Sequence, residues 1–381
     1  MTDKDASNAA AAPHTGMKHL PRQASRQPSI KDIARLARVS HPTVSRALQN
    51  SPLVNAETAA KIRKIAEDAG YRASAVARGL VTRRTRTIGL VVTTVDDPFA
   101  SEVACGIEEI ANDHRYAVFL ANSHADPERE RSVVRELAER RVDGIIVTSS
   151  RVGALYLPLL KELEVPIVLV NDQFPGEFVH SVMIANRDGT RAATEHLIAL
   201  GHRRIAYLGD RGGYQSDAER LAGYKDALTA AVIAFAPELA VEGDGQPEAA
   251  IHAMDALLQL PHPPTAVVCY NDMSALGAMR GLRARGLRVP EDVSVTGFDD
   301  LFFAAYLTPP LTTVRQPMRR MGQMAMENLF KLMSAQTSGQ TSDHTSGQTS
   351  DRASAVQIKV EAELIVRGST AKAPKPEAHH A

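Results

Sequence analysis

The 381-residue sequence predicts an α/β protein with a small three-helix head in front of a larger body of alternating strands and helices. Two observations predict this architecture. Apolar residues repeat at helical spacing between residues 29 and 73, and from residue 87 onward short runs rich in Val and Ile alternate with helical stretches, as in βα units. The number of units suggests two doubly wound halves of parallel sheet, with one large continuous sheet as the alternative.

The first 28 residues are rich in Ala, Ser and Gln and lack the apolar core of a signal peptide or membrane span. We therefore expect a disordered leader. No later apolar run reaches the length of a membrane helix, which predicts a soluble cytoplasmic protein. Cys105 and Cys269 both lie in apolar runs, so we expect two buried thiols in a reducing compartment.

The head is organised around its second helix. Ser40 is a good N-cap, and Pro42 falls in the first turn, where no backbone N–H is needed. Val44 and Leu48 point to one side, whereas the opposite side carries His41, Pro42, Ser45, Arg46 and Gln49. Helical periodicity before it and between Glu57 and Ala69, with the short turn at residues 38–40, predicts a helix-turn-helix domain over residues 29–73.

Charge supports a nucleic-acid partner for the head. The chain is neutral overall, but residues 29–87 hold twelve Lys and Arg against four Asp and Glu. The head should bind a polyanion and the negatively charged body should not. Any small helical bundle with a solvated face remains the alternative for the pattern taken alone.

Four stretches of the head resemble the LacI/GalR family of transcriptional regulators: Ser29-Ile30-Lys31-Asp32-Ile33-Ala34, Val39-Ser40, Thr43-Val44-Ser45-Arg46 and Gly70-Tyr71. The resemblance implies that His41, Pro42 and Arg46 contact base edges of a palindromic operator. It implies phosphate contacts for Ser40, Thr43, Ser45 and Asn50.

Residues 74–86 connect head and body. The segment from Ser74 to Leu80 is too short to form a stable helix alone in water, and Gly79 lowers its helix propensity further. The resemblance implies a hinge helix that orders on operator DNA, with Ala77 and Leu80 as DNA contacts and Leu80 wedged into the minor groove. A plain linker is the alternative. Basic residues at 83–86 continue the segment as a tether.

The body resembles the same family from Ile88 to Arg367, through motifs such as Gly297-Phe298-Asp299-Asp300 and Pro310-Leu311-Thr312-Thr313-Val314. This implies a two-lobed, periplasmic-binding-protein-like core over residues 87–367. Lobe 1 would comprise residues 87–185 and 314–335, and lobe 2 residues 186–313 and 355–367. The predicted strands are 88–95, 117–121, 144–148, 167–170, 181–184, 205–208, 266–270, 293–298 and 356–366, the last closing lobe 2. The predicted helices are 101–113, 128–140, 189–200, 219–231 and 272–285.

Two later segments fall outside this pattern. Residues 336–352 repeat Thr-Ser-Gly-Gln-Thr-Ser-Asp and are expected to form a flexible surface insertion. Residues 368–381 are expected to be a tail, without the leucine heptads that make some family members tetramers. We therefore expect a homodimer.

Polar residues that follow strands predict a ligand pocket, because ligands of open α/β sheets bind beyond the carboxyl ends of the strands. These residues are Asp97, Asn171, Asn271 and Asp299. Arg220 would add a fork of donors and Phe99 an apolar face for stacking, which suits a sugar-like effector. The family positions that match these six contact effector. Asp97 and Asn171 could equally be turn residues, Arg220 could be a solvated charge, and Asp272, Asp300 and His202 are expected to be capping or turn residues.

The competing classes are an enzyme and an extracytoplasmic sugar receptor. The sequence has neither G-x-G-x-x-G nor G-x-x-x-x-G-K-[ST] spacing, and no nucleophile, base and orienting residue stand out. A receptor would need a signal peptide and no DNA-binding head. We therefore expect a dimeric, effector-controlled transcription factor with no catalytic residues, no cofactor and no metal. The resemblance to the family implies that it is a repressor.

Overall fold

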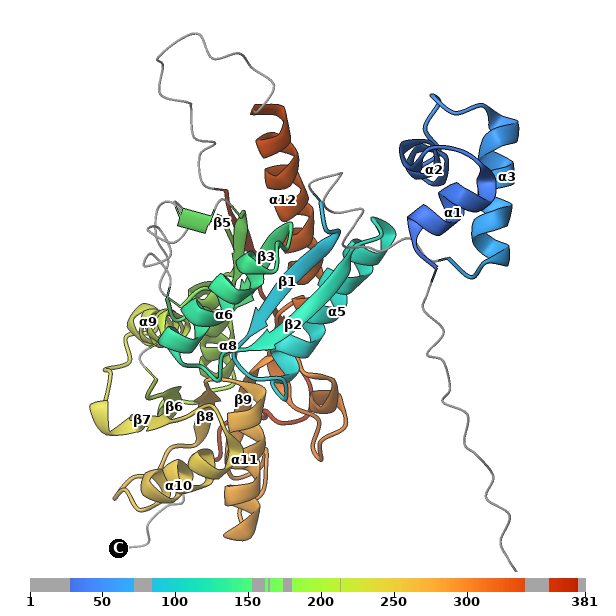
Figure 1. The fold of residues 1–381 in the computed structure, drawn as a ribbon. Coiled ribbons are helices and arrows are strands. Elements are labelled where there is room, and N and C mark those ends of the chain that lie inside the picture. Colours follow the sequence, from blue (N-terminus) through green and yellow to red (C-terminus); the bar gives the residue numbers. More distant parts are fainter. Residues whose placement is uncertain are drawn as a thin grey trace, which may run out of the picture. The chain divides into compact units, whose positions relative to one another are not determined.

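The computed structural model describes residues 28–71, 84–152, 162–163, 165–173, 180–212, 214–339 and 356–375. The leader, Ala77 and Leu80 of the connecting segment, and the low-complexity repeat beyond residue 339 lie outside the described residues. The chain divides into two compact units, a head and a body, with the boundary between residues 78 and 79. Figure 1 shows the elements of each unit.

The head consists of α1 (Ile30–Ala37), α2 (His41–Leu48) and α3 (Ala56–Asp68), as the sequence predicts. Ser29 caps α1 in a capping box with Asp32, and Ser40 caps α2. Arg38 takes a left-handed conformation, with φ of 56°, and so ends α1 and allows the tight turn. Ile33, Val44 and Ile62, one from each helix, are almost completely buried in the common core.

The body contains two six-stranded sheets, which confirms the two doubly wound halves. The sheet of lobe 1 has the order β11-β5-β4-β3-β1-β2, and every strand pair is parallel. Its strands are β1 (Thr87–Val92), β2 (Ala117–Asn122), β3 (Gly144–Thr148), β4 (Ile167–Val170), β5 (His180–Ile184) and β11 (Gln357–Val360).

Helices cover both faces of this sheet. Alternate residues of β1 point to opposite sides, so Leu90 packs into the core under α5 (Pro98–Asp113) and α12 (Met318–Gly339), whereas Val91 packs under α6 (Pro127–Glu139). Burial of β1, β3 and β4 on both faces explains the continuous apolar runs from which they were predicted, whereas β2 at the edge of the sheet is largely exposed.

Lobe 2 repeats the design with the order β12-β10-β9-β8-β6-β7, in which only the pair β10 and β12 is antiparallel among the described strands. Its strands are β6 (Ile205–Asp210), β7 (Ala240–Gly243), β8 (Ala266–Cys269), β9 (Ser294–Asp299), β10 (Thr312–Arg315) and β12 (Glu363–Ile365). Its helices are α8 (Asn186–Ala199), α9 (Gln215–Ala230), α10 (Pro247–Leu258) and α11 (Asp272–Ala284), with short 3-10 turns η2 (Pro237–Leu239) and η3 (Phe302–Ala305).

The third place at which the chain crosses from one lobe to the other lies later in the sequence than predicted. The last strand was expected to span residues 356–366 and belong wholly to lobe 2. Instead, β11 pairs with β5 in lobe 1, and the chain crosses at residues 361–362 before β12 pairs with β10 in lobe 2. Ile358 and Val360 pack against the lobe 1 core and Leu364 against the lobe 2 core, so one apolar run serves two sheets.

Other expectations also require correction. Helix α12 runs past residue 336 to Gly339, and residues 368–373 are part of lobe 2. Ser369 is completely buried and its hydroxyl donates to the carbonyl of Val295 at 2.6 Å, so the tail begins later than residue 368. Cys269 is buried as expected, but Cys105 is exposed, because it lies on the outer side of α5. His202 helps to end α8 as expected, because its backbone N–H donates to the Leu197 carbonyl at 3.2 Å after Gly201 in a left-handed conformation, and its side chain is in addition buried and bonded to Thr265 and Ser294.

In the part of the chain that the structure describes, no helix combines the length and the apolar character needed to span a membrane.

Candidate functional site

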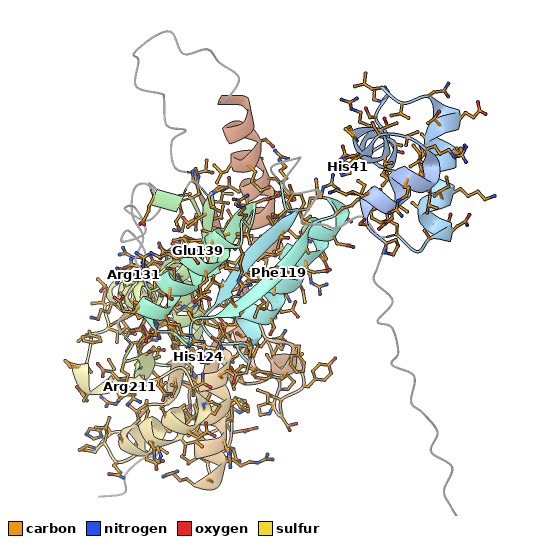
Figure 2. The ribbon with its side chains drawn as sticks, viewed as in Figure 1. His41, Phe119, His124, Arg131, Glu139 and Arg211 are labelled. Atoms are coloured by element: carbon orange, nitrogen blue, oxygen red, sulfur yellow. The ribbon has the colours of Figure 1, made fainter. Side chains whose placement is uncertain are left out.

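The first candidate site is the outer face of α2 in the head. His41, Pro42 and Arg46 are exposed, while Val44 and Ala47 on the opposite side are buried in the head core. His41 stands at the start of the helix (Figure 2). The helix therefore presents the three residues expected to read bases and keeps its apolar side inward.

The residues expected to hold phosphates flank this face. Ser40 accepts from the backbone N–H of Thr43 at 3.4 Å, and the two hydroxyls are 2.8 Å apart. Ser45 is half-buried, and its hydroxyl accepts from the Gln49 amide at 3.4 Å. Asn50 is exposed just after the helix with φ of 57°, a left-handed conformation that Asn tolerates. All four can reach a ligand outside the head.

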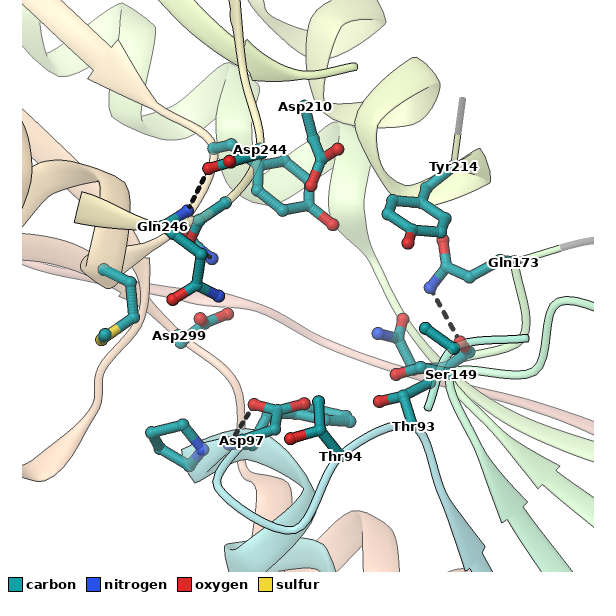
Figure 3. A pocket seen from close by; sticks show the side chains of 18 of the residues that line it. Thr93, Thr94, Asp97, Ser149, Gln173, Asp210, Tyr214, Asp244, Gln246 and Asp299 are labelled. Carbon is teal, nitrogen blue, oxygen red and sulfur yellow. Dashed lines mark hydrogen bonds between the residues drawn. The ribbon is translucent and has the colours of Figure 1, made fainter. Parts of the chain in front are cut away.

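The second candidate site is a cavity of about 440 Å³ in the body, with walls from both lobes. All six residues predicted from the sequence line it: Asp97, Phe99, Asn171, Arg220, Asn271 and Asp299. Figure 3 shows polar side chains that converge on its open centre. The strand-end rule succeeds because β4, β8 and β9 all direct their carboxyl ends at this cavity.

Arg220 forms the floor of the cavity on the lobe 2 side. It lies on α9 but is only 2 % exposed, so it is no solvated surface charge. Its Nε donates to Asn186 Oδ1 at 2.9 Å and its Nη1 to the carbonyl of Tyr270 at 2.6 Å. The guanidinium carbon lies 3.7 Å from the ring centroid of Phe298 and 4.6 Å from that of Tyr270. These contacts fix the guanidinium in one orientation.

Asp299 ends β9 and faces the same cavity. Its Oδ1 accepts from Gln316 Nε2 at 2.5 Å and lies 4.0 Å from Arg220 Nη2. Its φ of 125° is unusual for a residue with a side chain and marks local strain. Burial raises the pKa of Asp299 to about 7, although Arg220 and the Gln316 hydrogen bond oppose this rise.

Asp97 is both a helix-capping residue and part of the cavity lining. It caps α5 by accepting from the Phe99 backbone N–H at 3.0 Å, and it lines the cavity. Burial raises the pKa of its carboxyl above the usual range, more than the hydrogen bond from Phe99 lowers it. A capping carboxylate thus remains available to a ligand.

Asn271, rather than Asp272, caps α11, by accepting from the Ser274 backbone N–H at 2.8 Å. Asp272 is completely buried, where it accepts from the Thr313 hydroxyl at 2.5 Å and from the Leu301 backbone N–H. Asp300 pairs with Arg315 and Arg367. Neither Asp272 nor Asp300 lines the cavity, in agreement with their exclusion from the predicted site.

Sequence reasoning missed several lining residues. Asp210 follows the glycine after a predicted strand and could have been found by the strand-end rule, whereas Arg151, Gln173 and Gln316 lie in segments without a pattern. Further polar lining residues are Asp96, Tyr214, Asp244, Gln246 and Tyr270.

Direct contacts join the two lobes across the cavity. Gln173 Oε1 of lobe 1 accepts from the hydroxyl of Ser216, at the start of α9 in lobe 2, at 2.9 Å. The guanidinium carbon of Arg151 in lobe 1 lies 4.4 Å from the ring centroid of Tyr214 in lobe 2. Residues of both lobes therefore contact each other at the rim of the cavity.

Two family models match the chain. Residues 29–74 match the model of bacterial regulatory proteins of the lacI family, and residues 194–370 match a periplasmic binding protein-like domain.

Curated relatives include the HTH-type transcriptional repressor PurR of Aliivibrio fischeri strain MJ11, 38% identical over 306 residues, with 80% of this chain and 91% of that protein covered. The probable HTH-type transcriptional repressor ExuR of Bacillus subtilis strain 168 is 36% identical over 311 residues, with 80% and 92% covered.

Solved structures with a similar fold include the lac repressor dimer bound to operator and the anti-inducer ONPF, with a TM-score of 0.78 and 28% identity. A complex of the transcriptional regulator CelR with cellobiose has a TM-score of 0.65 and 31% identity. Both comparisons cover 90% of this chain and 99% of the other.

Proposed function

The chain belongs to the LacI family of bacterial regulatory proteins, and from this premise we propose that it is a dimeric repressor whose operator affinity is controlled by a sugar-like effector. The single observation that carries the proposal is the convergence of six sequence-predicted side chains from both lobes on one cavity, in a chain whose head exposes the polar face of α2.

For DNA recognition we propose that His41 and Arg46 donate to base edges in the major groove, while Pro42 makes apolar contact. Ser40, Thr43, Ser45 and Asn50 contact phosphates. Ala77 and Leu80 belong to the hinge part of this proposal and contact the minor groove. The exposure of α2 and the basic charge of residues 29–87 support the groove contacts.

For the effector we propose that Asp97, Asn171, Asn271 and Asp299 bind hydroxyl groups, that Arg220 donates to a ring or hydroxyl oxygen, and that Phe99 packs on an apolar sugar face. The mixed polar and aromatic lining supports a sugar-like ligand. The cellobiose complex of CelR and a ribose complex of a LacI family regulator from Enterococcus faecium show sugars bound to similar folds.

For assembly we propose a homodimer. Phe302 and Tyr306, in and next to η3 on lobe 2, are 79% and 83% exposed. Tyr306 also borders a groove with Leu276 and Met279 of α11. Large exposed apolar side chains that gather in this way are typical of an interface, and the lac repressor structure is a dimer.

We further propose that the protein acts in the cytoplasm, where its DNA lies, and that it is not an enzyme. The curated relatives compared above are named as repressors, and this chain matches them over nearly their whole length.

Two measurements test the proposed function: selection of the operator sequence, and the change in operator affinity caused by an effector. Full-length protein selects its operator from random duplex DNA, and fluorescence anisotropy then measures operator affinity with and without sugars and polyols that raise the melting temperature of the protein. We expect a palindromic site and at least one compound that changes operator affinity. A protein that selects no DNA sequence, or whose operator affinity no stabilising compound changes, would contradict the proposal.

A further inference from the structure

Carboxylates outnumber cations around the effector cavity. Five aspartates line it, against the guanidinium groups of Arg151 and Arg220. The aspartates are Asp96, Asp97, Asp210, Asp244 and Asp299. Figure 3 shows that four of them, from both lobes, surround the open centre. An anionic ligand such as a sugar acid would enter a negative field here.

The two guanidinium groups offset only part of this charge. Arg220 lies 4.0 Å from Asp299, but it is a single cation facing two carboxylates, Asp97 and Asp299, and it already donates to Asn186 and Tyr270. Arg151 lies on the ring of Tyr214 at the other end of the cavity, and Asp210 is the carboxylate that acts on it most strongly. The cavity around Asp97 and Asp299 is therefore left with excess negative charge.

Two buried acceptors in the lining lack a hydrogen-bond donor. Asn171 and Gln316 are 7 % and 3 % exposed, and neither Asn171 Oδ1 nor Gln316 Oε1 has a partner among the described residues. A buried acceptor without a donor is costly because its hydration is not replaced, so both positions favour a ligand rich in N–H or O–H donors. Among the described lining residues, Arg151 Nε is the one buried donor without an acceptor, and a ligand hydroxyl can accept its hydrogen bond.

Asp97 and Asp299 come from opposite lobes and repel each other. Asp97 is at the start of α5 in lobe 1, Asp299 is at the end of β9 in lobe 2, and the charge of Asp97 makes ionisation of Asp299 harder. A cation between them would replace this repulsion by two charge-assisted hydrogen bonds and draw the lobes together.

We propose that the effector is a hydroxylated amine, such as an amino sugar, whose ammonium group lies between Asp97 and Asp299 and beside Gln316. The proposal rests on the effector function proposed above and specifies the charge of the ligand. Its hydroxyls occupy the positions next to Asn171 and Arg151.

Calorimetry at pH 7 with the full-length protein tests the charge class. The probes are glucose, glucosamine and glucuronate, with the corresponding galactose and mannose sets. We expect at least one amine to bind roughly tenfold or more tightly than its neutral counterpart, because ionised hydrogen bonds are about twice as strong as neutral ones, and no acid to bind. A neutral sugar or acid that matches the amines, or amines that do not bind, overturns the proposal.

Asp97→Asn provides the positional test. Asn is as good an N-cap as Asp, so α5 should keep its cap while the charge disappears. The amine should lose its advantage and the neutral sugar should bind nearly as before. Asp113→Asn, at the exposed end of the same helix, is the matched control and should retain the amine preference. An amine preference that survives in Asp97→Asn overturns the placement of the ammonium.

Failure of this inference differs from failure of the proposed function. If a neutral or acidic compound from the wider screen binds and changes operator affinity, the repressor function stands and the amine proposal fails. If no compound of any charge affects the operator complex, the effector function itself fails.

Discussion

The head and the body place their functional residues in opposite environments. In the head, His41, Pro42 and Arg46 are exposed above an apolar core that they do not help to form. In the body, Arg220 and Asp299 are buried and hydrogen-bonded into the fold. Function can therefore be changed in the head with little effect on stability, whereas in the cavity a change in function also changes stability.

Arg220→Ala should show the strongest coupling. Removal of a buried charge leaves Asn186 Oδ1 and the Tyr270 carbonyl without the donor that Arg220 supplies, and Asp299 without its cationic partner, which typically costs about 3 to 5 kcal/mol. Denaturant unfolding of the body should show this loss, and calorimetry should show no effector binding, while operator affinity of the folded protein stays near normal. Arg187→Ala on α8 is the control, because its pair with Asp226 is exposed and screened by solvent, so its loss should change stability little. Equal stability of the two variants would contradict the coupling.

Leu80→Ser tests the segment between the two units. Two leucines in the minor groove of a dimer each contribute about 1.5 to 3 kcal/mol, so we predict a loss on the order of 3 kcal/mol, at least about a hundredfold in operator affinity. Effector affinity, non-specific DNA binding and unfolding of the body should not change. If the variant binds and bends the operator as the wild type does, the segment is only a linker.

The pH dependence of stability tests the coupling between function and stability in the body. The pKa of Asp299 is about 7 in the folded protein and near 4 when unfolded, so the unfolded state binds fewer protons between these values. Stability from this group is therefore present at low pH and lost as pH rises through 7. Facing groups are Arg220, Gln316, Asp97 and Asp272.

Asp299→Asn should consequently flatten the decrease in stability between pH 6.5 and 8, by roughly 0.8 kcal/mol. Burial lowers the pKa of His180, His196 and His202, so these groups make stability rise with pH near 6.5, but their contribution is the same in wild type and variant and cancels in the difference. Asp113→Asn should leave the profile unchanged. Parallel profiles for wild type and Asp299→Asn would show that Asp299 is ionised in the folded protein throughout.

Arg46→Ala should separate the two properties in the head. We expect a loss of about 1 to 3 kcal/mol in discrimination between the selected operator and a scrambled duplex, with no change in unfolding. Arg63→Ala on α3 removes the same charge from another exposed position and should weaken both duplexes alike. Equal losses on the two duplexes for Arg46→Ala would contradict base reading.

The sequence predicted what depends on local pattern. Ser40 revealed the start of α2, and strand ends revealed Asp97, Asn171, Asn271 and Asp299, because parallel strands bring such positions to one edge. Long-range packing was less accessible. The burial of Arg220, the split between β11 and β12, and the Gln173 contact with Ser216 depend on residues far apart in the chain. No local periodicity encodes them.

Ser40 is the residue at which the comparison should fail, because it serves both stability and binding within the head. It caps α2 through its contact with the Thr43 backbone N–H, and we propose that it also contacts a phosphate. Ser40→Ala should lower the stability of the head by about 1 kcal/mol. This loss should appear as a lower melting temperature of the head, followed by circular dichroism of its helices. The variant should also bind operator more weakly. Ser40→Asp keeps a capping oxygen and should preserve stability, but its charge should repel a phosphate and weaken binding more than Ala does. The Asp loss should shrink at high salt, since added ions screen the repulsion. If Ser40→Asp instead binds operator like the wild type, Ser40 acts only as a cap, and the separation between functional surface and structural core holds throughout the head.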